Sequence, residues 1–272
     1  MNESIIRTLS GLVYIILLVS ATLYSPFTFA ILFGIFLILS VVEFCRLANL
    51  DKAVPIVMAL AGLMLFGYNV NNNPASNLML NLAALFISVS LLMDLFKTGP
   101  LVPRDKTAKL ARLTGYVIIP FILIIKMAFL TNAFNPYIII GMFILIWAND
   151  TFAYIVGKLI GRHKLLERIS PKKTIEGFVG GMLFAVVGAY ILGQSSYFNT
   201  ALSPWQWMAF AAVLVIFGTL GDLVESQLKR NAGVKDSGKI MPGHGGILDR
   251  LDSVLFATPF LFLYYQILNY VS

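Results

Sequence analysis

The chain has 272 residues, of which 58% are hydrophobic and only 12% are charged. Soluble globular proteins are about 25% charged, so this composition excludes a water-soluble domain and indicates a protein whose surroundings are mostly lipid. The net charge of +7 does not indicate nucleic-acid binding, because the basic residues lie in loops between apolar segments, where membrane topology alone explains them.

Apolar segments of about 20 residues, the length of a membrane-spanning helix, follow one another along the chain. They cover roughly residues 5–24, 26–46, 53–70, 77–96, 108–131, 135–158, 175–194, 204–229 and 249–271. The first segment has no convincing small-residue cleavage site, so we interpret it as a span rather than as a signal peptide. These patterns predict an all-α polytopic membrane protein with about nine transmembrane helices.

Charge is distributed unevenly among the segments that connect these spans. Uncharged connections and ends are 71–76, 132–136, 195–203 and 269–272, whereas almost every Lys and Arg falls in 43–52, 97–112, 158–173 and 229–250. Positively charged residues are enriched in cytosolic loops of membrane proteins. We therefore expect a cytosolic N-terminus, an external C-terminus and a functional site on the cytosolic side.

The two parts of the chain differ in character. Residues 1–134 are hydrophobic spans with short connections and one basic loop, and we interpret them as an N-terminal transmembrane scaffold. Residues 135–272 carry ionisable groups inside spans and have inner loops rich in Gly, Lys and Ser, which favours a C-terminal transmembrane catalytic domain. An ionisable residue in the middle of a span costs about 2.5–3.5 kcal/mol on insertion scales, so it usually marks a functional site.

Acidic residues recur at a similar depth in three of the predicted spans. Asp150 lies in the sixth span and Asp222 and Glu225 lie in the eighth, while Asp249 and Asp252 begin the ninth. Helix-dipole complementation explains an acid in a first helical turn but not an acid deep inside a span. Several acids at one depth require a cation, and hard oxygen ligands beside basic residues suit Mg²⁺ that is bound partly through substrate phosphates.

One face of the eighth predicted span combines charges of both signs. Asp222, Glu225, Ser226 and Lys229 are spaced i, i+3, i+4 and i+7, so they share one helical face. Lys229 and the following Arg230 are also at the inner end of the span, where basic residues can serve as topology anchors alone. The acids on the same face favour a functional interpretation.

Two inner loops have the composition of phosphate-binding segments. The loop that follows the eighth span contains Lys235, Asp236, His244, Gly245 and Gly246. Glycines allow a backbone to approach a ligand closely and to direct its N–H groups at phosphate oxygens.

The other segment precedes the seventh span and contains Ser170, Lys172, Lys173 and Thr174. That helix is expected to begin on the cytosolic side, where its free N–H groups and positive dipole end can face a nucleotide.

The stretch from Ser226 to Asp252 follows the pattern S-x-x-K-R, then K-D, then H-G-G-x-x-D-R-x-D. This stretch resembles the signature of phosphatidate cytidylyltransferase, also called CDP-diacylglycerol synthase. The segments around Asp150, Ser170 to Thr174 and Asp222 are similar to the pattern of the same family, and the resemblance covers roughly residues 147–253. It implies an integral membrane enzyme that uses Mg²⁺ to convert CTP and phosphatidate into CDP-diacylglycerol and pyrophosphate at the cytosolic leaflet.

The resemblance also implies roles for individual residues. Phosphatidate would attack the α-phosphorus of CTP in line, so no protein nucleophile is required. The expected Mg²⁺ ligands are Asp222, Asp249 and Asp252. The expected catalytic residues are Asp222, Lys229, Arg230, His244, Asp249 and Arg250. The expected substrate-binding residues are Asp150, Ser170, Lys172, Lys173, Thr174, Glu225, Ser226, Lys235, Asp236, Gly245 and Gly246.

Two other functions share some of these features. A CTP-dependent polyprenol or phytol kinase would use the same nucleotide and metal but would transfer the terminal phosphate. An anionic-solute transporter would also carry intramembrane acids and basic inner loops. Uncharged outer loops, acids near one face and the lack of an apparent inverted repeat argue against transport. Because membrane enzymes of this size often associate, a homodimer is also considered.

Overall fold

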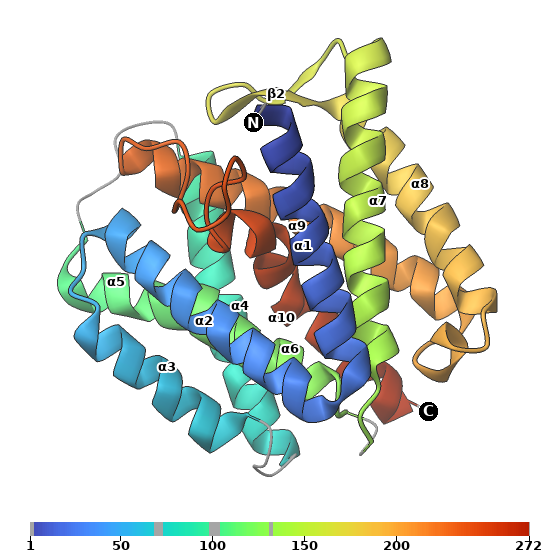
Figure 1. Cartoon of the computed structure of the whole chain (residues 1–272), viewed down its shortest axis with the longest axis horizontal. Helices are drawn as coiled ribbons and strands as arrows, with labels where there is room; N and C mark the ends of the chain where they lie inside the picture. The colour runs from blue at the N-terminus through green and yellow to red at the C-terminus, as the bar shows by residue number, and fades with distance from the viewer. Residues whose placement is uncertain (1–2, 68–72, 98–103, 131–132, 272) are drawn as a thin grey trace.

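A computed structural model describes residues 3–67, 73–97, 104–130 and 133–271, and most of them are helical (Figure 1). The helices are α1 (Glu3–Tyr24), α2 (Pro26–Ala48), α3 (Ala53–Phe66), α4 (Pro74–Phe96), α5 (Lys106–Leu113), the π-helical turn η1 (Thr114–Ile118), α6 (Ile119–Met127), α7 (Pro136–Ile160), α8 (Ile175–Gln194), the short 3-10 helix η2 (Phe198–Thr200), α9 (Pro204–Asn231) and α10 (Leu248–Val271). Two short strands, β1 (Lys164–Leu166) and β2 (Ser170–Thr174), connect α7 to α8.

The architecture agrees with an all-α polytopic membrane protein. Within the described residues, eight helical segments are long and apolar enough to cross a membrane. Helix α3 is apolar but has only 14 residues, fewer than the roughly 20 that a span usually requires. Nine spans and the orientation of the two ends stay predictions. The ends of two expected spans, at 70 and 131, lie outside the described residues. So do parts of the connections and ends at 71–76, 97–112, 132–136 and 269–272.

Four of the long helices begin with the same kind of residue pair, a Ser or Asn cap followed by proline. These pairs are Ser25–Pro26, Asn73–Pro74, Asn135–Pro136 and Ser203–Pro204. The cap side chain can accept a hydrogen bond from an N–H of the first turn, and proline fits the first helical position because its missing N–H would have no partner within the helix. All four starts lie at the ends that the charge pattern assigns to the outer side.

The hydrophobic core is shared by both parts of the chain. Every residue of α6 is buried, so this helix lies at the centre of the molecule. The Phe33 ring of α2 lies 6.4 Å from that of Phe121 in α6 and 6.3 Å from that of Phe143 in α7, between ring centroids. Aromatic contacts therefore join the N-terminal helices to the helix that opens the C-terminal part.

Helices α7, α8, α9 and α10 form successive packed neighbours in the C-terminal part (Figure 1). The buried positions of α8 are all Gly or Ala and recur every four residues, at Gly177, Gly181, Ala185, Ala189 and Gly193. Small residues at this spacing allow helix backbones to approach closely in a membrane. This packing fixes the start of α8 and the adjoining strand β2 against α7.

The hairpin of β1 and β2 is a small departure from the expected all-helical fold. The strands are antiparallel, and Lys164 is paired with Thr174. They contain three and five residues, which is too short for an alternating pattern to be recognised in the sequence. The hairpin ends directly at α8, because the Thr174 side chain accepts a hydrogen bond from the N–H of Gly177 at 3.1 Å and caps that helix.

Candidate active site

Lys229 links the end of α9 to the start of α10. Its ammonium group forms ion pairs with Glu225, one turn earlier on α9, and with Asp249, whose Oδ1 lies 2.7 Å away. Glu225 is completely buried, and the Lys229 side chain is 15% exposed. The predicted shared helical face is thus present, and it joins α9 to the acid that follows the glycine-rich loop.

The carboxylate of Asp249 also organises that loop. Its Oδ2 accepts hydrogen bonds from the N–H and hydroxyl of Ser237, both at 2.9 Å, and from the N–H of Gly246 at 2.7 Å. Gly245 has φ = +86°, and a Cβ atom at this position would collide with the Asp249 carboxylate. Gly245 therefore combines a left-handed backbone conformation with room for the carboxylate, which only glycine does without strain.

Glu43, from the N-terminal part of the chain, also binds this loop, which the sequence patterns did not indicate. It is only 1% exposed, and it accepts hydrogen bonds from the N–H groups of Ile247 at 3.1 Å and Leu248 at 2.8 Å and from the Ser237 hydroxyl at 3.1 Å. A side chain at Gly246 would collide with this carboxylate. Glu43 is the only acid in its span, and an ionisable residue inside a span is the signal that would have identified it.

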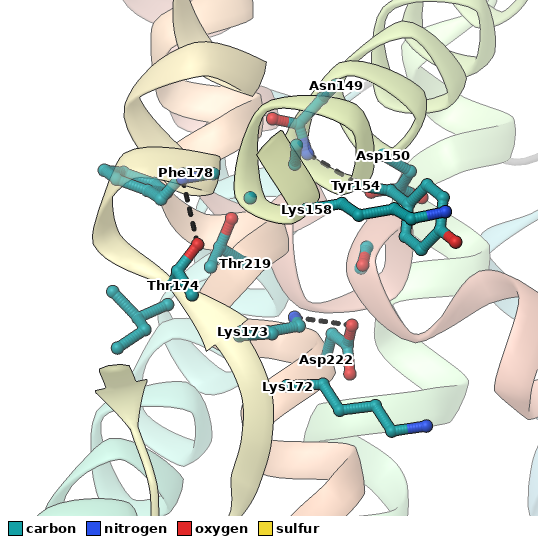
Figure 2. A pocket seen from close by; sticks show the side chains of 15 residues that line it. Asn149, Asp150, Tyr154, Lys158, Lys172, Lys173, Thr174, Phe178, Thr219 and Asp222 are labelled. Carbon is teal, nitrogen blue, oxygen red and sulfur yellow. Dashed lines mark hydrogen bonds and ion pairs between the residues drawn. The ribbon is translucent and has the colours of Figure 1, made fainter. Parts of the chain in front are cut away.

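A second charged cluster lies where β2 meets α9. Lys173 Nζ is 2.5 Å from Asp222 Oδ2, and the Ser226 hydroxyl donates a hydrogen bond of 3.2 Å to Asp222 Oδ1. Figure 2 shows Lys172 beside this pair and Asp150 across the pocket on α7. The Asn149 side-chain amide donates a hydrogen bond of 3.2 Å to Asp150.

All of these side chains except Ser226 line a cavity of about 340 Å³ between α7, β2, α8 and α9, which we call the lysine cavity (Figure 2). Its polar lining includes Asp150, Lys158, Lys172, Lys173, Thr174 and Asp222. Three lysines and the N-terminus of α8 give this cavity a positive wall. Such a wall suits a polyanionic ligand.

A neighbouring cavity of about 320 Å³, which we call the acid cavity, lies between α1, α7, α9, α10 and the loop before α10. Its polar lining includes Asp150, Asp222, His244, Asp249, Arg250 and Asp252. Asp150 and Asp222 line both cavities, as does Ser253. The two cavities therefore meet at carboxylates that the sequence placed at one depth.

His244 is held by the first helix. Its Nδ1 lies 2.8 Å from the hydroxyl oxygen of Ser10, which is also 3.0 Å from the main-chain oxygen of Pro242. Partial burial lowers the pKa of His244, and the positive charges of Arg250 and Arg7 lower it further. The imidazole is therefore mainly neutral at pH 7 and shares one hydrogen bond with Ser10 through Nδ1.

Some of the residues predicted from sequence lie away from these cavities. Arg230, Lys235 and Asp236 are exposed and line neither the lysine cavity nor the acid cavity. Ser170, Ser226, Lys229 and the two glycines also lie outside both linings, and Glu225 is buried beneath Lys229. Their predicted roles in binding or catalysis stay predictions.

The carboxylates of the predicted metal ligands do not form a compact metal-binding cluster in the described residues. Among residues 3–67, 73–97, 104–130 and 133–271, no three His, Cys, Asp or Glu side chains come close enough together to hold a metal ion. Asp222 and Asp249 are each paired with a lysine, whereas the nearly buried Asp252 receives a hydrogen bond from the N–H of Ser253 at 2.7 Å. All three predicted metal ligands nevertheless line the acid cavity.

Comparison with known proteins gives a consistent result. A phosphatidate cytidylyltransferase of Staphylococcus saprophyticus is 49% identical over 131 residues, which are 48% of this chain and 50% of the relative. A protein of the same name from Staphylococcus aureus (strain COL) is 47% identical over 131 residues, which are 48% of this chain and 50% of the relative. Another from Staphylococcus epidermidis is 50% identical over 123 residues, which are 45% of this chain and 46% of the relative. The chain thus spans about half the length of the curated relatives that it matches. A sequence profile of the cytidylyltransferase family matches residues 5–268, and the chain therefore belongs to this family.

Proposed function

We propose that this protein is a phosphatidate cytidylyltransferase, which converts CTP and phosphatidate into CDP-diacylglycerol and pyrophosphate. The observation that carries the proposal is the contact between the two cavities: the positively lined lysine cavity and the acid cavity share Asp150 and Asp222. A reaction between two phosphorylated substrates requires their phosphates side by side, and two cavities with a common wall can hold them in this way. The names of the relatives support the same reaction.

In the proposed reaction, an oxygen of the phosphatidate phosphate forms a bond to the α-phosphorus of CTP. The bond between that phosphorus and the oxygen bridging to the β-phosphate breaks, and pyrophosphate leaves with the electron pair. No covalent intermediate with the protein is needed, so catalysis consists of positioning and charge neutralisation.

The lysine cavity is the proposed site of the CTP triphosphate. Lys172 and Lys173 extend from β2, and Thr174 fixes the start of α8, whose positive dipole end faces the same side. These groups would neutralise the triphosphate and hold the α-phosphorus near the shared carboxylates. Lys229 and Arg250 would contribute positive charge on the acid-cavity side, where the phosphatidate phosphate approaches.

The residues present also fit the predicted Mg²⁺. Asp222, Asp249 and Asp252 offer carboxylate oxygens on one cavity, and Mg²⁺ commonly takes few protein carboxylates and completes its shell with substrate phosphates. Because no three of these side chains come close enough together in the described residues to hold one ion, we propose Asp222 and Asp249 as its direct ligands and Asp252 as a further ligand or as a partner of a metal-bound water. When bound, Mg²⁺ would neutralise developing charge on the phosphates.

The proposed site faces the cytosol, because the hairpin with Lys172 and Lys173 and the loop before α10 belong to the positively charged connections. CTP would therefore bind from its own compartment. A homodimer stays a prediction that analytical ultracentrifugation in detergent would test.

Incubating the purified protein with CTP, phosphatidate and Mg²⁺, followed by chromatography of the lipids, tests the proposed activity. We expect a CDP-lipid together with pyrophosphate. A phosphorylated polyprenol with CDP, formed only when polyprenol is supplied, would establish the kinase instead. Turnover of neither lipid, together with solute uptake into proteoliposomes, would establish the transporter.

A further inference from the structure

A third cavity lies beside the acid cavity and differs from it in character. It has a volume of about 400 Å³, and we call it the α1 groove. Its apolar lining includes Ile6, Leu9, Val13, Leu17, Phe36 and Ile240. The four α1 residues recur every three or four positions, so they form one stripe along the helix.

The α1 groove adjoins the acid cavity and shares part of its wall. Tyr14 and Met241 line both. Arg250 and His244 line the acid cavity, so an apolar groove lies directly beside a positively charged group that suits a phosphate. A ligand that fills both spaces must have an anionic head and an apolar tail.

The stripe on α1 is also open on its outer side. Leu9 is 49% exposed, Val13 62% and Leu17 46%. Helix α1 is long and apolar enough to cross a membrane, so in a bilayer these side chains contact lipid chains rather than water. A lipid can therefore reach the groove sideways without passing through water.

We propose that the α1 groove holds an acyl chain of phosphatidate, with the lipid phosphate in the acid cavity near Arg250 and His244. This inference rests on the proposed function and adds to it the path and the recognition of the lipid substrate. The two substrates then approach Asp150 and Asp222 from opposite sides, with CTP in the lysine cavity and phosphatidate along α1. Apolar contacts in the groove contribute to the affinity for long chains and not to the affinity for CTP.

Two substitutions on α1 form a matched pair for testing this proposal. Val13 and Ile16 are each 62% exposed on the same helix, but only Val13 lines the groove. Val13→Trp should raise the KM for dioleoyl phosphatidate about tenfold, the effect of losing the burial of about two methylene groups. The KM for CTP and the KM for dihexanoyl phosphatidate should not change, and Ile16→Trp should leave all three values as in the wild type.

Equal effects of the two substitutions would overturn the proposal. So would an equal rise in KM for the short-chain and long-chain lipids, because blocking a chain groove must spare a short chain. Absence of any CDP-lipid from the wild-type protein would contradict the proposed function instead, and the lipid-binding proposal would then be decided by crosslinking alone.

Crosslinking on the wild-type protein gives a test that does not depend on turnover or on the folding of a variant. A phosphatidate with a diazirine in one acyl chain should label peptides containing Leu9, Val13 or Ile240, and unlabelled phosphatidate should compete. A phosphatidylcholine with the same diazirine chain should label them less. Equal labelling of these peptides by the two lipids, or labelling that unlabelled phosphatidate displaces only from other peptides, would each overturn the proposal.

Discussion

The carboxylate of Glu43 in α2 accepts a hydrogen bond of 2.8 Å from the main-chain N–H of Leu248, the first residue of α10. The same carboxylate also binds Ile247 and Ser237. The loop that carries His244 and leads to Asp249 is therefore fastened to the N-terminal helices. The N-terminal part does more than surround the C-terminal helices, because it fixes the loop on which the proposed site depends.

Glu43→Gln should lower kcat for CDP-lipid formation by about 10- to 100-fold, since hydrogen bonds to a charged group contribute about 1.5–3 kcal/mol each and an amide nitrogen cannot accept one. The KM for CTP should change little, because Glu43 does not line the lysine cavity. Asp51→Asn, at an exposed acid shortly after α2, is the control and should retain wild-type activity. An unchanged kcat for Glu43→Gln would show that this carboxylate does not hold the loop.

Removing Lys229 should separate stability from catalysis. Lys229→Met leaves Glu225 buried without its cation, which should reduce the free energy of unfolding by about 3–5 kcal/mol. Adding Glu225→Gln should restore part of the lost stability, measured as the thermal unfolding midpoint in detergent. CDP-lipid formation should be absent in Lys229→Met and should remain absent in the double variant. Recovery of activity together with stability would mean that Lys229 has only a structural role.

The pH dependence of stability should contain a contribution from His244. Its pKa is lowered in the folded protein, so folding favours the neutral imidazole. The stabilisation is complete above the unfolded pKa of about 6.5 and is lost as the pH falls through the lower folded pKa. When the pH falls from 7 into the mildly acidic range in which histidine titrates, the unfolding midpoint of the wild type should therefore fall more than that of His244→Gln. Identical curves would contradict the assignment.

Removal of divalent cations tests the proposed Mg²⁺ ligands. EDTA should abolish CDP-lipid formation and added Mg²⁺ should restore it. Asp249→Asn should lose activity at every Mg²⁺ concentration while it inserts into the membrane normally. Full activity after EDTA treatment, or wild-type turnover by Asp249→Asn, would exclude the proposed metal site.

The predictable features depend on local patterns in the sequence. The long apolar segments and the cap-proline pairs place the helices, and the i, i+4 spacing places Glu225 and Lys229 on one face. The depth of Asp150 and Asp222 in their spans predicts that they lie near each other, and both line the same two cavities.

Other features depend on contacts between distant segments. Ser10 and His244 are separated by 234 positions, and Glu43 and Leu248 by 205, so no local pattern connects them. The glycines after His244 indicated close approach to phosphate, which stays a prediction. In the structure, Gly245 and Gly246 make room for the carboxylates of Asp249 and Glu43. Glycine indicates close approach in the sequence but does not indicate to what.

In the proposed reaction, the α-phosphorus of CTP is transferred to phosphatidate. CTP labelled with ³²P at the α-position and, in a parallel reaction, at the γ-position distinguishes this transfer from transfer of the terminal phosphate. We expect the α-label in the lipid extract and the γ-label in pyrophosphate. Recovery of the γ-label in the lipid, with the α-label left in CDP, would contradict it.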